Sequence, residues 1–150
     1  MGTTPDDELI LRELGHLIRQ LTRLVGGADE GPPMTATQRI ALVELGDEGP
    51  LRLNDLARRM GTSSPTASRS VDTLEALGLV TRAPESSDRR ALSIEVSARG
   101  RDLLDERLKR AAQAFEPAAA TLSAAERDAL VALLRRMTDA LRASSSRRCA

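Results

Sequence analysis

Residues 53–100 read LNDLARRMGTSSPTASRSVDTLEALGLVTRAPESSDRRALSIEVSARG, and this stretch decides the fold. Its first half predicts two short helices, one over residues 55–60 that Asn54 caps and one from Ser64 to about Leu77. Gly61 ends the first helix. Ser64 caps the second, and Pro65 follows at its first position, where a missing N–H costs no hydrogen bond. The two helices are therefore joined by a short turn.

A β-hairpin is expected directly after the second helix. Residues 79–82 predict one strand, and residues 83–90 form a polar loop with one proline. Leu92, Ile94 and Val96 then alternate with polar or small residues, which is typical of a strand with one buried face. Two helices joined by a short turn and followed by a hairpin predict a winged helix-turn-helix.

The second helix has the residue pattern of a helix that reads DNA. At about 100° per residue, Ala67, Val71 and Leu74 fall on one side, which must face the core. The opposite side carries small polar residues and one arginine, as close approach to base edges requires. Arg69 can donate two hydrogen bonds to guanine, and Thr66 can contact a base edge or a thymine methyl. The residues expected in the major groove are Ser64, Pro65, Thr66, Ser68, Arg69 and Thr73.

Two further groups extend the expected DNA surface. Thr62 and Ser63 stand beside the start of the second helix, where hydroxyl and N–H groups suit phosphate oxygens. Asp88, Arg89 and Arg90 form the hairpin tip, and an arginine there can enter the negative potential of a narrow minor groove. Asp88 could hold Arg90 extended. The same tip is equally consistent with an ordinary charged loop that contributes little.

Amphipathic helices flank this central region. Apolar residues recur at three- and four-residue steps from Asp6 to Val25, which predicts one helix with a wide apolar stripe. A long helix is expected from Ser97 to Phe115, and Pro117 is expected to break it. A last helix opens at residue 123, where a serine is followed three residues later by a glutamate in a capping box.

Several motifs in residues 53–100 recur together in one known family. They are Leu56-Ala57, Ser64-Pro65-Thr66-x-Ser68-Arg69, Leu74-Glu75-x-x-Gly78-Leu79-Val80-x-Arg82, Asp88-x-Arg90, and Val96-Ser97-x-x-Gly100. On these motifs the stretch resembles the MarR family of bacterial regulators, with Ser97 in place of the commoner threonine. The resemblance implies a mainly α fold with a small β-hairpin, an α+β winged helix-turn-helix with N- and C-terminal dimerisation helices. It also implies a cytoplasmic, homodimeric repressor of transcription.

The resemblance divides the single chain into regions. Residues 35–97 would form the DNA-binding lobe, residues 6–27 and 98–143 the dimerisation helices, and residues 144–150 a disordered tail. The apolar stripes support dimerisation independently, because a small winged lobe cannot bury both of them. The alternative is that both stripes fold back on their own chain. A twofold dimer would place its two Arg69 side chains about 10 base pairs apart, on an inverted repeat in double-stranded DNA.

The resemblance also implies release from DNA when a small hydrophobic or acidic effector enters a cleft between dimer helices and winged lobe. His16, Arg19 and Arg23 are the candidate effector ligands. His16 equally suits a dimer interface or a free surface, and the two arginines equally suit salt bridges to acidic neighbours. Some relatives sense oxidants with a cysteine near the first helix. This chain has only Cys149, which is expected to be an ordinary exposed thiol.

Composition excludes several other classes of function. Phe115 is the one aromatic residue among 150, so a base-stacking surface for single strands is excluded. With one cysteine and one histidine, no metal site or cofactor is expected, and neither a glycine-rich phosphate loop nor a catalytic triad points to an enzyme. No apolar run is long enough to span a membrane.

The alternative function is a winged-helix module that binds proteins and no DNA. The helix face with Thr66 and Arg69, together with Arg90, is the feature that distinguishes the DNA-binding function from the protein-binding one.

Overall fold

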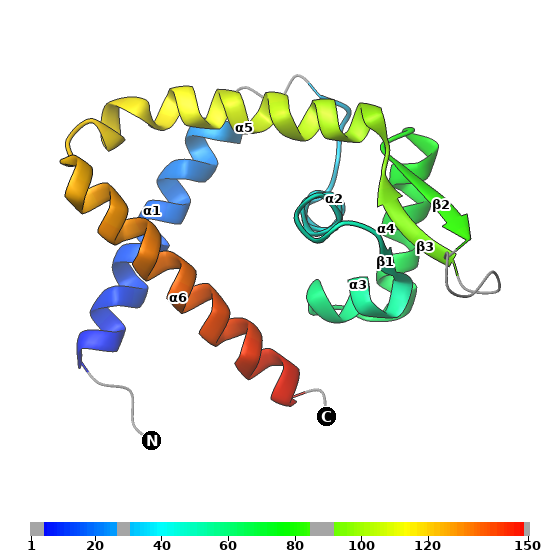
Figure 1. Ribbon diagram of the computed structural model, residues 1–150, viewed down its shortest axis with the longest axis horizontal. Coiled ribbons are helices and arrows are strands. Elements are labelled where there is room, and N and C mark those ends of the chain that lie inside the picture. Colours follow the sequence, from blue (N-terminus) through cyan, green and yellow to red (C-terminus); the bar gives the residue numbers. More distant parts are fainter. Residues whose placement is uncertain (1–4, 27–30, 85–91, 149–150) are drawn as a thin grey trace. The chain divides into compact units, whose positions relative to one another are not determined.

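Residues 5–26, 31–84 and 92–148 are described by a computed structural model, and they contain six helices and one small three-stranded sheet (Figure 1). Their contacts divide the chain into two units, Met1–Ala111 and Ala112–Ala150, with the boundary inside α5. The elements in chain order are α1 Pro5–Gly26, α2 Ala36–Glu48, β1 Leu51–Arg52, α3 Leu53–Arg59, α4 Ser64–Ala76, β2 Val80–Pro84, β3 Leu92–Val96, α5 Ala98–Ala119 and α6 Ala124–Arg148.

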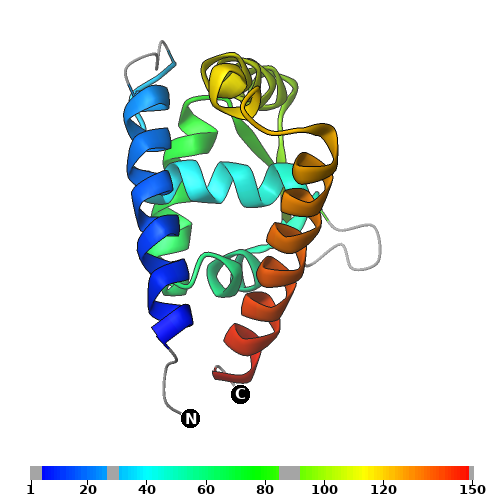
Figure 2. The ribbon, with the colours of Figure 1, turned by 90° about the vertical axis from the view of Figure 1, so that its left-hand side faces the viewer.

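The core of the first unit lies between α2, α3, α4 and the sheet. Its largest fully buried side chains are Leu42, Leu45, Leu56, Val71, Leu74, Leu79 and Val80. Figure 2 shows α2, in cyan, lying across α4, in green. Ala67, Val71 and Leu74 are all fully buried, so the side of α4 that the sequence assigned to the core does face it. The opposite side of α4 is thereby left toward solvent.

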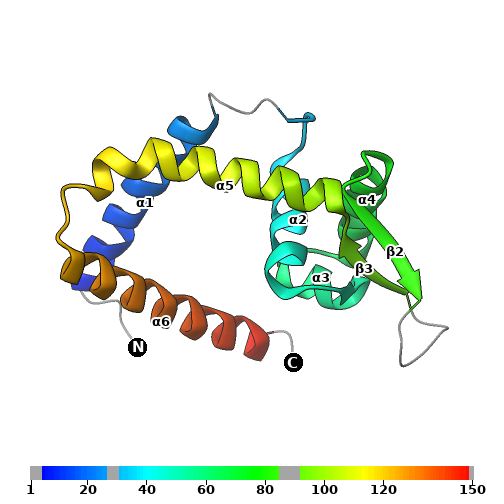
Figure 3. The same cartoon turned by 45° about the horizontal axis from the view of Figure 1, so that its top comes forward.

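The sheet has three antiparallel strands in the order β1-β3-β2. β2 and β3 form the expected hairpin, with Arg82 opposite Ile94, and Figure 3 shows the pair beside α4. β1 pairs Leu51 with Ile94 on the other edge of β3, a strand that the sequence analysis missed because it is two residues long. The helices and this small sheet confirm the mainly α fold with a winged helix-turn-helix.

Side-chain caps begin α2, α5 and α6, and the capping box at the start of α6 is the one that the sequence predicted. Thr35 and Gln38 form a capping box at α2, in which the Gln38 N–H donates to Thr35 Oγ1 at 3.3 Å. Ser97 accepts from the N–H of residue 100 at 3.0 Å and so caps α5. At α6 the Ser123 N–H donates to Glu126 Oε2 at 2.8 Å. Hydrogen bonds from the Ser123 hydroxyl and N–H lower the pKa of Glu126 below its usual value.

Two of the expected caps in the helix-turn-helix are wrong. Asn54 lies inside α3, which starts one residue earlier after Arg52, and its side chain does not cap the helix. Instead, its amide oxygen accepts a hydrogen bond from Ser64 Oγ at 2.9 Å. The N-cap of α4 is Ser63, without a side-chain cap bond, so Pro65 sits one position later than expected. A contact between the two helices thus replaces a local cap.

The ends of α5 and α6 also differ from expectation. Pro117 does not break α5, which continues to Ala119, and the N–H of residue 120 donates to the Glu116 carbonyl at 2.8 Å. Within the last turn a proline removes only one helical hydrogen bond. α6 runs to Arg148, so residues 144–148 belong to a helix and not to a tail, and the Ser144 hydroxyl donates to the Leu141 carbonyl at 2.8 Å. Cys149 lies outside the described residues.

Most of the large apolar side chains that remain exposed among the described residues lie on α1 and α6. On α1 they are Leu9, Ile10, Leu11, Leu17 and Ile18, and on α6 they are Leu130, Val131, Leu133, Leu134, Met137 and Leu141. Large apolar patches on a protein surface mark sites of association. None of the described helices has both the length and the apolar character needed to cross a membrane.

Gly100, in the first turn of α5, allows that helix to pack against the end of α4 and the sheet. A Cβ at this position would overlap the Leu79 carbonyl oxygen and lie 2.7 Å from Val96 Cγ1. Gly15, inside α1, has only the flexible end of Arg19 nearby, at 3.4 Å. Substitution by alanine should therefore have opposite effects on the free energy of unfolding at the two glycines.

We expect Gly100→Ala to lower the free energy of unfolding by about 1–3 kcal/mol, because the backbone must shift to relieve the overlap. Gly15→Ala is the matched control and should raise stability by up to about 1 kcal/mol, because alanine favours a helix interior. Urea denaturation followed by circular dichroism measures both. A Gly100→Ala variant as stable as the unmodified protein would contradict the packing described here.

Candidate nucleic-acid interface

The turn between α3 and α4 is held by hydrogen bonds on both sides. Gly61 takes a φ of +61°, which a residue with a side chain rarely adopts. The Thr62 N–H then donates to the Ala57 carbonyl at 3.0 Å and returns the chain onto α3. Ser63 Oγ lies 2.9 Å from Thr66 Oγ1. The two hydroxyl residues expected to meet phosphates, Thr62 and Ser63, therefore stand together at the start of α4.

The outer side of α4 carries the residues expected in the major groove. Pro65 and Arg69 are exposed, and Ser64, Thr66, Ser68 and Thr73 are partly exposed. The Thr73 hydroxyl donates to the Arg69 carbonyl at 3.0 Å, which keeps its polar end against the helix. The structure thus brings these six side chains to one helix.

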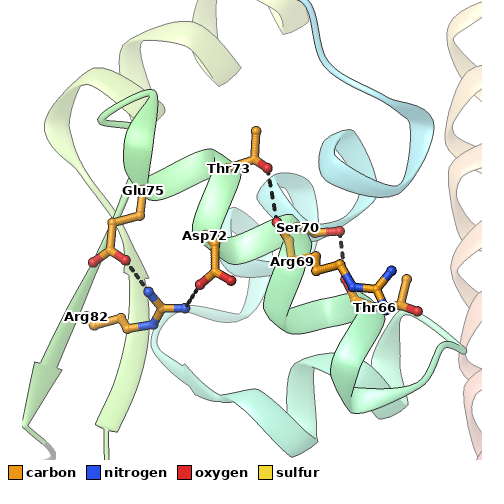
Figure 4. A network of polar contacts seen from close by, with 7 residues as sticks. All are labelled: Thr66, Arg69, Ser70, Asp72, Thr73, Glu75 and Arg82. Carbon is orange, nitrogen blue, oxygen red and sulfur yellow. Dashed lines mark hydrogen bonds and ion pairs between the residues drawn. The ribbon is translucent and has the colours of Figure 1, made fainter.

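Ser70, on the same helix, is buried and does not face solvent. It is 6% exposed, and its hydroxyl donates to the Thr66 carbonyl at 3.1 Å (Figure 4). A buried hydroxyl needs such a partner, because leaving it unsatisfied is costly. Ser70 is therefore part of the packing of α4 and is not available to a ligand.

Two arginines near α4 have contrasting surroundings. In the part of the chain that the structure describes, no ion pair involves Arg69. Arg82, on β2, reaches α4 and binds two carboxylates there (Figure 4). Its Nη2 lies 2.5 Å from Asp72 Oδ1, and its Nη1 donates to Glu75 Oε2. Arg69 therefore has no ion pair among the described residues, whereas Arg82 is bound to two carboxylates of α4.

The ion pairs of Arg82 also affect its protonation. The hydrogen bond to Asp72, together with the charges of both carboxylates, raises the pKa of Arg82 above its ordinary value, although partial burial opposes this. Glu75 and Arg82 belong to one of the family motifs, but the sequence alone assigned them no role. The seven-residue spacing of Glu75 and Arg82 was the signal that the sequence offered. Only the turn of the chain from α4 into β2 brings the two side chains into contact.

The wing is described at its base only. Ser93 Oγ donates to the Ala83 carbonyl at 3.3 Å, and the paired strands end at Pro84 and Leu92. The tip residues Asp88, Arg89 and Arg90 lie outside the described residues. Their expected contact with a minor groove therefore stays a prediction.

A cavity of about 620 Å³ lies in the first unit between α2, β3 and α5. Its walls are largely aliphatic, with charged side chains at the edges. They include Val43, Leu45, Val96, Leu104, Leu108, Arg39, Arg101, Glu95 and Asp105. The candidate effector ligands His16, Arg19 and Arg23 are exposed on α1 and do not line this cavity. The walls of the cavity come from three separate segments, so the sequence alone does not reveal it.

The described residues contain no group of three or more histidine, cysteine, aspartate or glutamate side chains placed to hold a metal ion. The polar chemistry concentrated on the outer side of α4 is hydrogen bonding by hydroxyls and by one guanidinium. Those groups suit recognition of a nucleic acid duplex.

Comparison with known proteins gives the same picture. A family model described as the MarR family matches residues 33–91. The transcriptional repressor NicR of Pseudomonas putida is 32% identical over 143 residues, which cover 93% of this chain and 89% of NicR. An uncharacterised regulator of Mycobacterium bovis, described as helix-turn-helix type, is 28% identical over 83% of this chain and 87% of its own length.

Solved structures agree in fold over nearly the whole chain. RV1404 from Mycobacterium tuberculosis is 27% identical with a TM-score of 0.74, over 93% of this chain and 95% of that one. BpsR of Bordetella bronchiseptica, whose DNA binding is regulated by 6-hydroxynicotinic acid, is 26% identical with a TM-score of 0.65, over 92% and 99%. From its sequence, its fold and these relatives, the chain belongs to the MarR family of DNA-binding transcriptional regulators.

Proposed function

We propose that the protein is a homodimeric, cytoplasmic repressor that reads an inverted repeat in double-stranded DNA, without enzymatic activity, and is released by a small-molecule effector. One observation carries the DNA-reading part of this proposal. Arg69 is exposed on α4 and has no ion pair among the described residues, while small hydroxyl side chains surround it. A guanidinium in that state is free to donate two hydrogen bonds to a guanine.

The neighbours of Arg69 allow α4 to approach bases closely. Thr66 lies one turn before Arg69 and Thr73 one turn after it, and neither is large enough to hold the helix away from the groove. Thr62 and Ser63 lie at the N-terminal end of α4, where backbone N–H groups also favour phosphate. We propose that these two residues and the tip residues Arg89 and Arg90 bind the backbone or minor groove and set the position of Arg69.

The exposed apolar stripes of α1 and α6 support dimerisation. Every described residue of α6 from Ala124 to Ala143 is exposed in the single chain, including Leu134 and Met137. Burial of such side chains contributes about 1.5–3 kcal/mol each, so a chain that leaves them in water gains by association. We propose that residues 6–27 and 98–143 contribute the dimer interface. A twofold axis would then give each α4 one half-site of an inverted repeat.

Selection from random duplex DNA near physiological salt tests the DNA-reading proposal. We expect enrichment of an inverted repeat with half-sites about 10 base pairs apart. Arg69→Ala should cost about 1–3 kcal/mol on that duplex and relax specificity at one base position. Arg89→Ala serves as the contrast and should weaken all duplexes alike. Enrichment of no sequence, or unchanged affinity in both Arg69→Ala and Arg90→Ala, would favour the protein-binding module instead.

Sedimentation equilibrium tests the dimer. The unmodified protein should have twice the 16.1 kDa mass of one chain at micromolar concentration. Leu134→Glu places a charge in the apolar stripe of α6 and should shift the protein to a monomer, because burying an unpaired charge is strongly unfavourable. Ala132→Glu, on the opposite side of the same helix, is the control and should leave the dimer intact. A dimeric Leu134→Glu variant would show that α6 does not form the interface.

We propose the cavity between α2, β3 and α5 as the effector site, in place of the exposed cluster of His16, Arg19 and Arg23. Its volume lies within the usual range for small ligands, about 300–1,000 Å³. The aliphatic walls would hold a flat ring by shape, and an arginine at the edge would pair with a carboxylate. The relative BpsR, which responds to 6-hydroxynicotinic acid, supports a small heteroaromatic acid as the effector class.

Titration with 6-hydroxynicotinic acid tests this site. We expect the acid to raise the melting temperature and to lower the affinity for the selected duplex. A ligand that prefers the released state must weaken DNA binding by the same factor by which DNA weakens the binding of the ligand. Leu108→Trp places a bulkier side chain on the wall of the cavity and should abolish both effects, whereas Lys109→Trp, on the next residue of α5, should not. A Leu108→Trp variant that responds like the unmodified protein would place the effector elsewhere.

A further inference from the structure

We propose that Arg82 is a positioning residue for DNA reading, which holds Asp72 away from Arg69 and so keeps Arg69 available to a base. This inference rests on the proposed reading of DNA by α4. It assigns a role in specificity to a residue that lies on the wing strand and not on the helix that reads the bases.

Asp72 follows Arg69 by three residues on α4, and side chains at this spacing are neighbours on a helix surface. Asp72 is 59% exposed, so its carboxylate is free to swing toward the guanidinium of Arg69 unless another group holds it. An ion pair between the two would occupy the donors that Arg69 needs for guanine. It would also place a negative charge where phosphates approach.

Arg82 removes this competition from the other side of Asp72. Its Nη2 binds Asp72 Oδ1 at 2.5 Å, on the side of α4 that faces β2 (Figure 4). Arg82 itself is fixed, because β2 pairs with β3 and places Arg82 opposite the buried Ile94. Its side chain is only 27% exposed, which limits its access to phosphate.

Glu75 gives the guanidinium a second anchor. The two terminal nitrogens of Arg82 bind different carboxylates, Asp72 and Glu75, one turn apart on α4. A planar guanidinium can hold both at once, whereas a lysine ammonium acts as a single point charge. Glu75 stands six residues from Arg69, so it is not the neighbour of Arg69 on the helix surface. Of the two carboxylates that Arg82 binds, Asp72 is therefore the competitor for Arg69.

The test compares Arg82→Gln with two double variants on the duplex that the unmodified protein selects. Fluorescence anisotropy gives the affinity, its dependence on salt, and the discrimination at the base that Arg69 reads. We expect Arg82→Gln to bind about tenfold more weakly and to lose that discrimination, an effect of the size that coupled charged residues show. Asp72→Asn in the Arg82→Gln background should restore most of both, because the competitor no longer carries a charge.

Glu75→Gln in the same background is the matched control and should restore neither the affinity nor the discrimination. Unchanged binding by Arg82→Gln, or equal rescue by both double variants, would overturn the proposal. A salt dependence that becomes shallower in Arg82→Gln by the loss of one phosphate contact, about 0.9 in slope, would also overturn it. Such a result would make Arg82 a direct DNA ligand.

The melting temperature of each variant separates a loss of positioning from a loss of the fold. Surface ion pairs contribute little to stability, so all variants should melt within a few degrees of the unmodified protein. If Arg82→Gln melts far lower, Asp72→Asn on its own becomes the deciding variant, since it should then bind DNA at least as tightly as the unmodified protein. Failure of the unmodified protein to select any duplex would instead overturn the proposed function itself.

Discussion

The structure depends on the burial of one side of α4. Ala67, Val71 and Leu74 are fully buried against α2, α3 and the sheet, and this fixes the rotation of the helix about its axis. With the rotation fixed, Arg69 has to face solvent, because it lies on the other side of the helix. Hydrophobic packing thus decides which polar groups the protein presents, although none of the buried residues would touch a ligand.

Arginine makes up nearly all the positive charge of the chain, so surroundings and not residue type distinguish its roles. Arg59 lies 2.8 Å from Glu48 and ties α3 to α2, while Arg82 ties β2 to α4. Both connect elements of the winged lobe across the surface of its core. Arg69 has no such partner among the described residues, and its charge is therefore directed outward. A count of basic residues would not separate these three cases.

Sequence alone predicted the features that depend on neighbours along the chain. The capping box at Ser123, the two strands of the hairpin and the buried side of α4 all follow from local periodicity and short-range hydrogen bonds. The features it missed depend on which segments meet in space. Asn54 binds Ser64 across the turn and does not cap its own helix, Arg82 finds its partners on α4, and the cavity is walled by α2, β3 and α5. Such contacts depend on the register and crossing of whole elements.

The strand β3 links the proposed effector site to the proposed DNA reader. Glu95 and Val96 line the cavity, and Ile94, the preceding residue, pairs with Arg82 on β2. A ligand that shifts β3 must therefore also shift the strand that carries Arg82 or strain the ladder between them. If the ligand and DNA prefer different positions of β3, each must weaken the binding of the other by the same factor. Control of Asp72 by Arg82 would then provide a short physical path for that coupling, from the cavity through one strand pair to α4.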